Sequence, residues 1–317
     1  MTTRNMTREQ WLAERRTGIG GSDIAAILGL SPWRTAVDVW LDKTGRSGPG
    51  EETEAMRIGT ELEDYVARRY AETRGRQVRR FTTMLRQGVR IGNIDRLVVP
   101  EGAKVASVGG EVRTDLALEC KTTSCAWPDG VPLYYQTQVQ WYIGLAPSIA
   151  AFDVAALDLV HKAFTVHRVD RDDETIAMMS ATAEGWWLRH VEGGEMPPPS
   201  NESDCRRLWA RSNPGKTVAA SAELEARIES YRRLASKRDA LEESMSEVRG
   251  AICAAMGDAE RVADAAGRTL ATWRSAKDRA VTDWEALARE LGATDAQIVA
   301  HTSAKPGGRR FLLGKVA

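Results

Sequence analysis

The stretch that decides the fold is Leu116-Ala117-Leu118-Glu119-Cys120-Lys121-Thr122, together with Ile91-Gly92-Asn93-Ile94-Asp95 upstream of it. Side chains alternate between the two faces of a β-strand, so Glu119 and Lys121 point to one face and Cys120 to the other. An acid and an amine on an otherwise buried strand cost desolvation energy. A metal ion bound by Asp95 and Glu119 would compensate this cost.

Strand and helix patterns surround these two segments. β-branched residues on both sides of Gln87-Gly88 predict an antiparallel hairpin, with Asp95 inside its second strand. A third strand carries Glu119, and a helix with Gln138 follows it. The expected strands are 77–85, 89–99, 115–122, 149–159 and 161–169, and the expected helices are 7–14, 24–28, 36–43, 56–74, 133–145 and 171–190.

A proline run, Met196-Pro197-Pro198-Pro199, marks a domain boundary. We expect residues 1–199 to form the core and residues 200–317 a largely helical C-terminal region with a long helix, a short hairpin and another helix. Between Val218 and Met256, apolar residues recur every three or four positions, which predicts one amphipathic helix of roughly 60 Å. This region is interpreted as a surface for oligomer or partner contacts, with a packing appendage of the core as the alternative.

Composition describes an ordinary soluble globular protein of 317 residues, 43% hydrophobic and 28% charged. The formal net charge is zero, so bulk charge does not indicate a nucleic-acid binder, although acidic surface can offset a basic groove. No stretch reaches the roughly 20 apolar residues of a membrane helix, and the N-terminus is polar, which predicts a cytoplasmic protein. The four cysteines and four histidines show no ligand spacing, so a bound metal would have oxygen ligands and be Mg²⁺ or Mn²⁺.

A glycine-rich loop lies near the N-terminus: Arg15-Arg16-Thr17-Gly18-Ile19-Gly20-Gly21-Ser22-Asp23. Ser22 or Asp23 is expected to cap the helix that follows. A basic pair and a serine at such a turn can hold a phosphate, because glycines allow close approach and the helix offers free amides. The alternative is a capped helix after a tight turn.

Asp95 and Glu119 on adjacent strands can converge on one cation, with the backbone carbonyl of Cys120 as a further oxygen ligand. Lys121 can then orient a water molecule or stabilise charge on a phosphate. This arrangement favours hydrolysis of a phosphodiester. The spacing alone leaves a surface strand with a salt bridge as the alternative.

Five motifs occur in one order within residues 8–195: the Gly20-Gly21-Ser22-Asp23 segment, Gly59-x-x-x-Glu63, Gly92-Asn93-Ile94-Asp95, Leu118-Glu119-Cys120-Lys121-Thr122 and Gln138-Val139-Gln140. This order resembles the YqaJ-like viral recombinase family, the lambda-exonuclease branch of the PD-(D/E)XK nucleases. Ile94 stands where the superfamily's name has proline, a departure common in this branch. The resemblance implies an α/β, restriction-endonuclease-like core with a central mixed β-sheet flanked by helices.

The resemblance also implies roles for single residues. Asp95 and Glu119 correspond to the metal ligands and Lys121 to the catalytic lysine. Glu63 resembles the helix-borne acid that completes the metal site. Gln138 resembles the glutamine that helps to arrange the active site or the substrate.

Arg15 and Ser22 match the positions that bind the 5′-phosphate of the DNA end in this family, and Arg16 is available for the same role. The implied activity is Mg²⁺-dependent degradation of one strand of duplex DNA from its 5′ end, with two ions per active site, to leave a 3′ overhang. Members are similar in forming ring-shaped homo-oligomers, trimers or tetramers, that work beside a single-strand annealing protein. A phage or prophage protein in the bacterial host cytoplasm is thereby implied.

Two other interpretations compete with this one. A nuclease of the same fold with a different DNA-repair task, carrying an iron–sulfur cluster, would need four cysteines in a set arrangement, and Cys120, Cys125, Cys205 and Cys253 are scattered. A non-catalytic DNA-end-binding or scaffold protein is the alternative from another class. Trp33 is interpreted as a core residue, with a wedge between DNA strands as its alternative.

Overall fold

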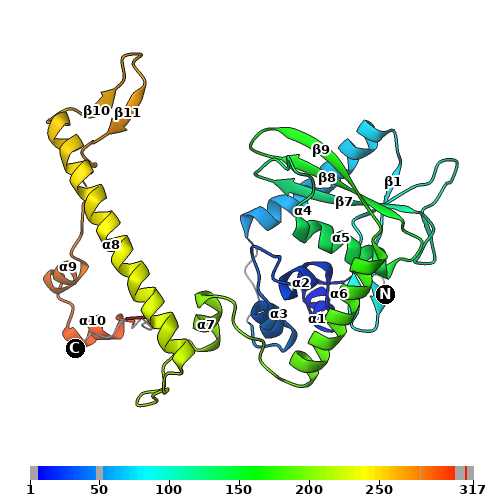
Figure 1. Cartoon of the computed structure of the whole chain (residues 1–317), viewed down its shortest axis with the longest axis horizontal. Coiled ribbons are helices and arrows are strands. Elements are labelled where there is room, and N and C mark those ends of the chain that lie inside the picture. The colour runs from blue at the N-terminus through cyan, green and yellow to red at the C-terminus, as the bar shows by residue number, and fades with distance from the viewer. Residues whose placement is uncertain (1–5, 48–52, 279, 304–310, 313–317) are drawn as a thin grey trace. The chain divides into compact units, whose positions relative to one another are not determined.

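The computed structural model describes residues 6–47, 53–278, 280–303 and 311–312. The chain folds as two compact units, Met1–Leu208 and Trp209–Ala317 (Figure 1). The helices of the first unit are α1 (Arg8–Arg16), α2 (Gly21–Ile27), α3 (Ala36–Lys43), α4 (Glu54–Arg74), α5 (Leu133–Leu145), α6 (Asp173–Trp186), a π-helix (Trp187–Glu192) and α7 (Glu202–Leu208). Its strands are β1 (Val78–Arg80), β2 (Leu85–Gln87), β3 (Arg90–Gly92), β4 (Arg96–Val98), β5 (Ser107–Val108), β6 (Glu111–Val112), β7 (Leu116–Thr123), β8 (Ala151–Asp158) and β9 (Ala163–Asp170).

A five-stranded sheet with the order β1-β4-β7-β8-β9 is the centre of the first unit. β7 and β8 run parallel, and the other neighbours in this sheet are antiparallel. A parallel pair needs a crossover connection, and α5 supplies it on the way from β7 to β8. The sheet is therefore mixed and flanked by helices, which confirms the predicted fold class.

Different helices cover the two faces of this sheet. Ala117 of β7 belongs to a core cluster that includes residues of α2, α3, α5 and α6. Leu118 points the other way and packs in a second cluster with Val66 and Tyr70 of α4. Because alternate residues share a face, Glu119 and Lys121 lie on the side of Ala117, where α5 packs.

The chain before Asp95 differs from the predicted hairpin. β2 and β3 form a tight hairpin of their own, while β1 pairs with β4 in the main sheet. The sequence predicts Asp95 inside a strand, whereas in the structure Asp95 lies in a bend directly before β4. Its Oδ2 accepts the Cys120 N–H at 2.9 Å, so the side chain provides the acceptor that a further strand residue would have offered.

The glycine-rich loop also differs from its prediction at the helix cap. α2 begins at Gly21 with Gly20 as its N-cap, rather than after a cap at Ser22 or Asp23. Asp23 is the third helical residue, and its Oδ2 accepts the Gly20 N–H at 3.0 Å. A carboxylate at this position reaches back to the cap amide, which explains the earlier start.

The first unit extends beyond the proline run. The Thr35 hydroxyl donates to Asp204 Oδ1 at 2.8 Å, and the Ser200 N–H donates to Asp204 Oδ2 at 2.8 Å. These bonds hold α7 to the core, so the compact unit ends at Leu208 rather than at the expected 199.

The second unit is built on the 35-residue helix α8 (Ala222–Met256), about 52 Å long at about 1.5 Å per residue. The hairpin of β10 (Arg261–Ala263) and β11 (Thr269–Thr272) follows, and then α9 (Trp284–Glu290) and α10 (Asp295–Ala300). Apolar side chains of α8 remain exposed, among them Leu234, Leu241 and Val248. None of the helices within the described ranges is long and apolar enough to cross a membrane.

Candidate active site

Glu119 and Lys121 of β7 form a buried ion pair. Glu119 is 2% exposed, and Lys121 Nζ lies 2.7 Å from Glu119 Oε1. Burial alone would lower the pKa of Lys121, but the negative charges of Glu119 and Asp95 outweigh burial and raise that pKa. Lys121 therefore stays protonated near neutral pH and acts as a positive charge rather than as a proton acceptor.

Gln138 of α5 holds both members of this pair. Its Nε2 donates to Glu119 Oε1 at 2.9 Å, and its Oε1 accepts from Lys121 Nζ at 3.2 Å. The same Nε2 donates to the Tyr142 hydroxyl at 3.0 Å, one helical turn further along α5. A carboxylate only accepts and an ammonium only donates, so these partners fix the orientation of the amide.

Asp95 lies across from Glu119 where β4 begins. Arg96 pairs with Leu118, and continuing this antiparallel register by one residue places Asp95 opposite Glu119. Burial, and then the negative charges of Glu119 and Glu63, raise the pKa of Asp95 well above its usual range. Neighbouring carboxylates repel each other unless a cation or a proton compensates them.

The donor set fits a hard divalent cation. Glu119 Oε2 is buried and has no hydrogen-bond partner among the described residues. An unsatisfied buried oxygen of this kind is costly, and a cation between Asp95 and Glu119 would satisfy it. No three His, Cys, Asp or Glu side chains within the described part of the chain gather as a ligand set. Mg²⁺ does not require such a set, because one or two carboxylates and several waters are its usual ligands.

Glu63, the acid that the family resemblance assigns to the metal site, is bound by an arginine. It lies one helical turn before the buried Val66 of α4, so it faces the sheet. Arg96 Nη1 donates to Glu63 Oε1 at 2.6 Å and to the Asp95 carbonyl at 2.7 Å. Glu63 therefore reaches Asp95 through Arg96 and through its charge.

The structure brings Arg15 and Ser22 together. Arg15 Nη2 donates to Ser22 Oγ at 3.2 Å, and the Arg15 guanidinium lies 4.8 Å from the centre of the Trp11 ring. Arg16 turns elsewhere, with its Nε 3.5 Å from Asp42 Oδ1. Of the two arginines that the sequence left open, Arg15 is the one beside Ser22.

A buried ion cluster behind this loop was missed by the sequence analysis. Asp23 is fully buried, with Lys43 Nζ 2.7 Å from its Oδ2 and Arg34 Nη1 2.7 Å from its Oδ1. Burial by itself would raise the pKa of Asp23, but the charges of Lys43, Arg15 and Arg34 hold it well below its usual range. The capping position of Asp23 was a readable signal, whereas no spacing rule connects it with Lys43 on another helix.

Cys120 is the cysteine that lies on β7 beside the acidic residues, and none of the four cysteines forms a disulfide. Burial, and then the charges of Asp95 and Glu119, raise the pKa of the Cys120 thiol. That thiol stays protonated, so Cys120 contributes through its backbone.

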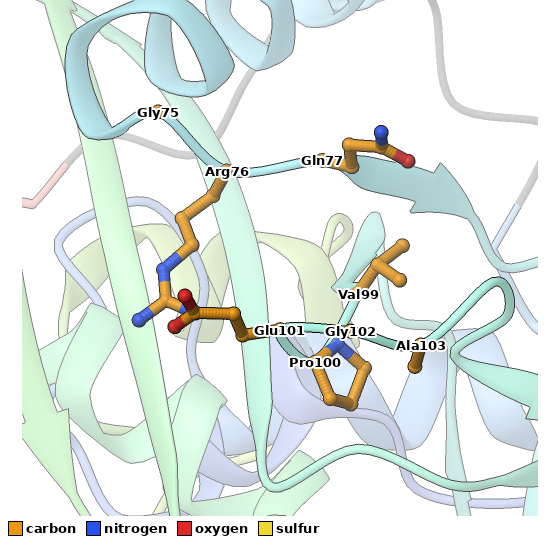
Figure 2. A pocket seen from close by; sticks show the side chains of 8 residues that line it. All are labelled: Gly75, Arg76, Gln77, Val99, Pro100, Glu101, Gly102 and Ala103. Carbon is orange, nitrogen blue, oxygen red and sulfur yellow. The ribbon is translucent and has the colours of Figure 1, made fainter.

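A hollow beside the sheet lies away from these residues. It is a cavity of about 320 Å³ lined by Gly75–Gln77 and Val99–Ala103, and Figure 2 shows its side chains. Val99 follows the end of β4 that is opposite to Asp95, and only Arg76 and Glu101 of the lining carry charge. The residues that line this cavity include no acidic pair, and Asp95, Glu119, Lys121 and Gln138 are not among them.

Trp33 lies at the surface, contrary to its interpretation as a core residue. It is 64% exposed. Its ring lies 4.8 Å from that of Tyr134 in an edge-to-face contact.

A mixed sheet with helices on both faces, and with an aspartate and Glu-x-Lys meeting where β4 begins, defines a restriction-endonuclease-like, PD-(D/E)XK fold. The profile of the YqaJ-like viral recombinase domain matches residues 10–147. The chain is 35% identical over 269 residues to the uncharacterized protein YqaJ of Bacillus subtilis (strain 168), with 80% of each protein covered. The protein belongs to the YqaJ-like viral recombinase family, and this membership supports a nuclease of the phage-recombination type.

Solved structures similar to this chain include two exonucleases. One is the alkaline exonuclease LHK-Exo of Laribacter hongkongensis, with 19% identity, 59% of this chain and 93% of that chain covered, and a TM-score of 0.45. The other is a phage-related exonuclease of Haemophilus somnus 129PT, with 14% identity, 58% and 100% covered, and a TM-score of 0.40.

Proposed function

We propose that the protein is a Mg²⁺-dependent 5′-to-3′ exonuclease that degrades one strand of linear double-stranded DNA and leaves a 3′ single-stranded overhang. The observation that carries the proposal is the buried Glu119 carboxylate. One of its oxygens binds Lys121 and Gln138, and the other has no partner in the described part of the chain. A carboxylate held in this way beside Asp95 is suited to a cation.

Asp95, Glu119 and the carbonyl of Cys120 would hold Mg²⁺, with Mn²⁺ as a substitute. By family resemblance, Glu63 completes the metal site, and each active site holds two ions. The N–H and C=O of one strand residue point to the same edge, and the Cys120 N–H faces Asp95, which supports its carbonyl as a ligand. When bound, the ion supplies a Lewis acid that activates water and neutralises charge on the phosphate.

The side chains around this position supply orientation and charge. The Lys121 ammonium would donate a hydrogen bond to the attacking water or to a phosphate oxygen, and Gln138 fixes Lys121 against Glu119. Arg96 holds Glu63 and the backbone of Asp95 in place. The water oxygen forms the new P–O bond and gives up a proton to the solvent, the P–O3′ bond breaks, and the leaving 3′ oxygen takes up a proton from the solvent.

Arg15 and Ser22 would give the reaction its direction. Their guanidinium and hydroxyl groups lie together and can bind a terminal phosphate with charge-assisted hydrogen bonds. Cleavage of the P–O3′ bond leaves a new 5′-phosphate on the shortened strand. The same pair can then bind the new end, which suits repeated steps from 5′ to 3′.

The remaining assignments follow the family resemblance. Ring-shaped homo-oligomers, trimers or tetramers, would surround the DNA, and a single-strand annealing protein would take over the 3′ overhang. Apolar side chains exposed on α8 support subunit or partner contacts for the C-terminal region. The related repair nuclease and the non-catalytic end-binding protein remain the alternatives.

Incubation of linear duplex DNA with the protein and Mg²⁺ tests the proposal, with and without a 5′-phosphate and beside a Lys121→Ala variant. We expect the wild-type protein to shorten the 5′-phosphorylated strand and the variant to lose this activity. Degradation by both proteins at the same rate would overturn the mechanism. Binding of DNA ends without degradation would favour the non-catalytic alternative.

A further inference from the structure

Arg86 of β2 holds the end of the helix that carries Arg15. Its Nη2 donates to Glu14 Oε1 at 2.8 Å and to the Thr17 hydroxyl at 2.6 Å, and its Nη1 donates to the Thr17 carbonyl at 3.3 Å. Glu14 and Thr17 stand on either side of Arg15 in the sequence. We call these bonds from Arg86 to Glu14 and Thr17 the Arg86 clamp.

The clamp closes a network at the C-terminus of α1. Thr17 is the C-cap of this helix, and its hydroxyl also donates to the Glu14 carbonyl at 2.8 Å. The last carbonyls of a helix lack intrahelical partners and carry partial negative charge, so a guanidinium is a favourable partner for them. The Arg86 side chain is 38% exposed, so the clamp is a surface contact and its removal does not open the core.

The backbone that follows the clamp is fixed on the hairpin of β2 and β3. The Ile19 N–H donates to the Val89 carbonyl at 2.7 Å, and the Ile91 N–H donates to the Ile19 carbonyl at 2.9 Å. Space is limited here as well, because a Cβ atom on Gly18 would lie 2.6 Å from the Val89 carbonyl oxygen. The hairpin that carries Arg86 therefore also supports the glycine-rich loop.

Arg15 is held at its backbone and reaches Ser22 with its side chain. Lys43 Nζ donates to the Arg15 carbonyl at 2.7 Å, and Arg15 Nη2 donates to Ser22 Oγ at 3.2 Å. Groups that bind a ligand together must be held to within about 0.5 Å by the residues around them. Because the guanidinium is at the end of a long side chain, its place beside Ser22 depends on a fixed end of α1.

The charge of Arg86 is already engaged. Its Nη2 lies 2.8 Å from Glu14 Oε1 in an ion pair. A cation that is paired with a carboxylate attracts a phosphate less than an unpaired cation does, because the two charges partly cancel at a distance. This pairing favours a positioning role for Arg86 over direct contact with a phosphate.

We propose that Arg86 is a positioning residue for the phosphate site and fixes the last turn of α1 so that the Arg15 guanidinium stays beside Ser22. The inference rests on the proposed function, because it assumes that Arg15 binds the 5′-phosphate of the DNA end. It adds to that function a residue that lies outside the five sequence motifs and on a different element from both phosphate ligands.

Binding in EDTA tests this inference without hydrolysis. Linear duplexes with and without a 5′-phosphate compete with a fluorescently labelled phosphorylated duplex for the full-length protein, and the ratio of the two affinities is the phosphate preference. The variants are Arg86→Ala, Glu14→Ala and the double variant. Arg69→Ala is the matched control, because Arg69 is an exposed cation of α4 that is paired with Glu72. Thermal unfolding of each variant shows that it is folded.

We expect Arg86→Ala and Glu14→Ala each to lower the phosphate preference by about 2- to 12-fold, the range of one hydrogen bond. The double variant should lose no more than either single variant, because both changes break the same contact. Arg69→Ala should keep the wild-type preference. A higher preference in Glu14→Ala would mean that Arg86 itself binds the phosphate, and it would overturn the positioning role.

The clamp and the proposed function fail in different ways. A preference that is lost in Arg15→Ala but kept in Arg86→Ala would overturn the clamp and leave the phosphate site in place. An equal fall in affinity for both duplexes in Arg86→Ala would show a general structural effect and would also overturn the clamp. A wild-type protein without any phosphate preference would remove the phosphate site and the clamp together.

Discussion

A Cβ atom on Gly21 would lie 2.9 Å from Cγ of Gln138, so the loop that positions Ser22 packs directly on the side chain that positions Glu119 and Lys121. The same Cβ would lie 3.0 Å from the ring of Tyr142. On the proposed assignments, recognition of the DNA end and hydrolysis are joined by this close contact between α2 and α5. The glycine is needed for space, since its backbone is ordinary helix.

Gly21→Ala should lower activity without unfolding the protein. The added methyl group must displace Gln138 or Tyr142, and a shift of about 1 Å at a catalytic group can cost about 100-fold in rate. We expect a fall of that order in the rate of 5′-end degradation, with thermal stability lowered only modestly. The matched control is Gly185→Ala, where nothing lies within 4 Å and activity should be unchanged. Equal activity of both variants would show that the contact does not position Gln138.

Mg²⁺ should stabilise the folded protein through Glu119. An ion that binds only the native state raises its stability with ion concentration. We expect added Mg²⁺ to raise the unfolding temperature of the wild type and EDTA to reverse the rise. Glu119→Gln should abolish the response, whereas Glu61→Gln, an exposed acid of α4, should keep it. A full response in Glu119→Gln would place the ion elsewhere.

Arg15→Ala should remove the preference for phosphorylated ends. The loss of a charge-assisted hydrogen bond is worth about 1.5–3 kcal/mol, or about 10- to 150-fold in affinity. Competition between duplexes with and without a 5′-phosphate measures the preference. Arg16→Ala is the control, because Arg16 lies beside Asp42 and not beside Ser22. A preference that survives in Arg15→Ala and disappears in Arg16→Ala would reverse the assignment.

Asp23→Asn should destabilise the first unit in a pH-dependent manner. Breaking a buried ion pair typically costs about 3–5 kcal/mol. The pKa of Asp23 is depressed in the folded state, so its contribution is full above the unfolded value of about 3.9 and declines as the pH falls below it. Urea denaturation should show a constant difference from wild type between pH 7 and about pH 4, and a smaller one below.

Asp42→Asn provides the control for that series. Asp42 contacts the same cations, but its side chain is 30% exposed, so a loss of well under 3 kcal/mol is expected. If the loss of unfolding free energy in Asp23→Asn grew as the pH fell below about 4, the result would contradict a depressed pKa of Asp23 in the folded state.

Local patterns predicted the elements that depend on local interactions. The helices 36–43 and 133–145 have the expected bounds, because Thr35 caps the first and Pro132 directly precedes the second. The alternation of side chains along a strand likewise predicted that Glu119 and Lys121 lie on the same face of the sheet. The bend at Asp95 could not be foreseen, because it depends on a hydrogen bond to Cys120 in a strand more than twenty positions away.

The sequence also did not predict the hydrogen-bond partners of individual site residues. Glu63 stood in a readable motif, but its bond to Arg96 depends on how α4 lies on the sheet. The sequence did not place α7 with the core, because the proline run before it indicated a boundary. In the structure, the Thr35 hydroxyl donates to Asp204 of α7 and ties this helix to the core. The roles assigned to the site residues stay predictions: Asp95, Glu119, Lys121, Gln138, Glu63, the Cys120 carbonyl, Arg15 and Ser22.

The ion cluster around Asp23 has a consequence for how DNA-end binding depends on salt. Lys43, Arg34 and Arg15 surround this one buried carboxylate, so the loop that carries Ser22 keeps more positive than negative charge. On the proposed assignments, this excess charge would attract a terminal phosphate, and the affinity for the DNA end would fall as the salt concentration rises.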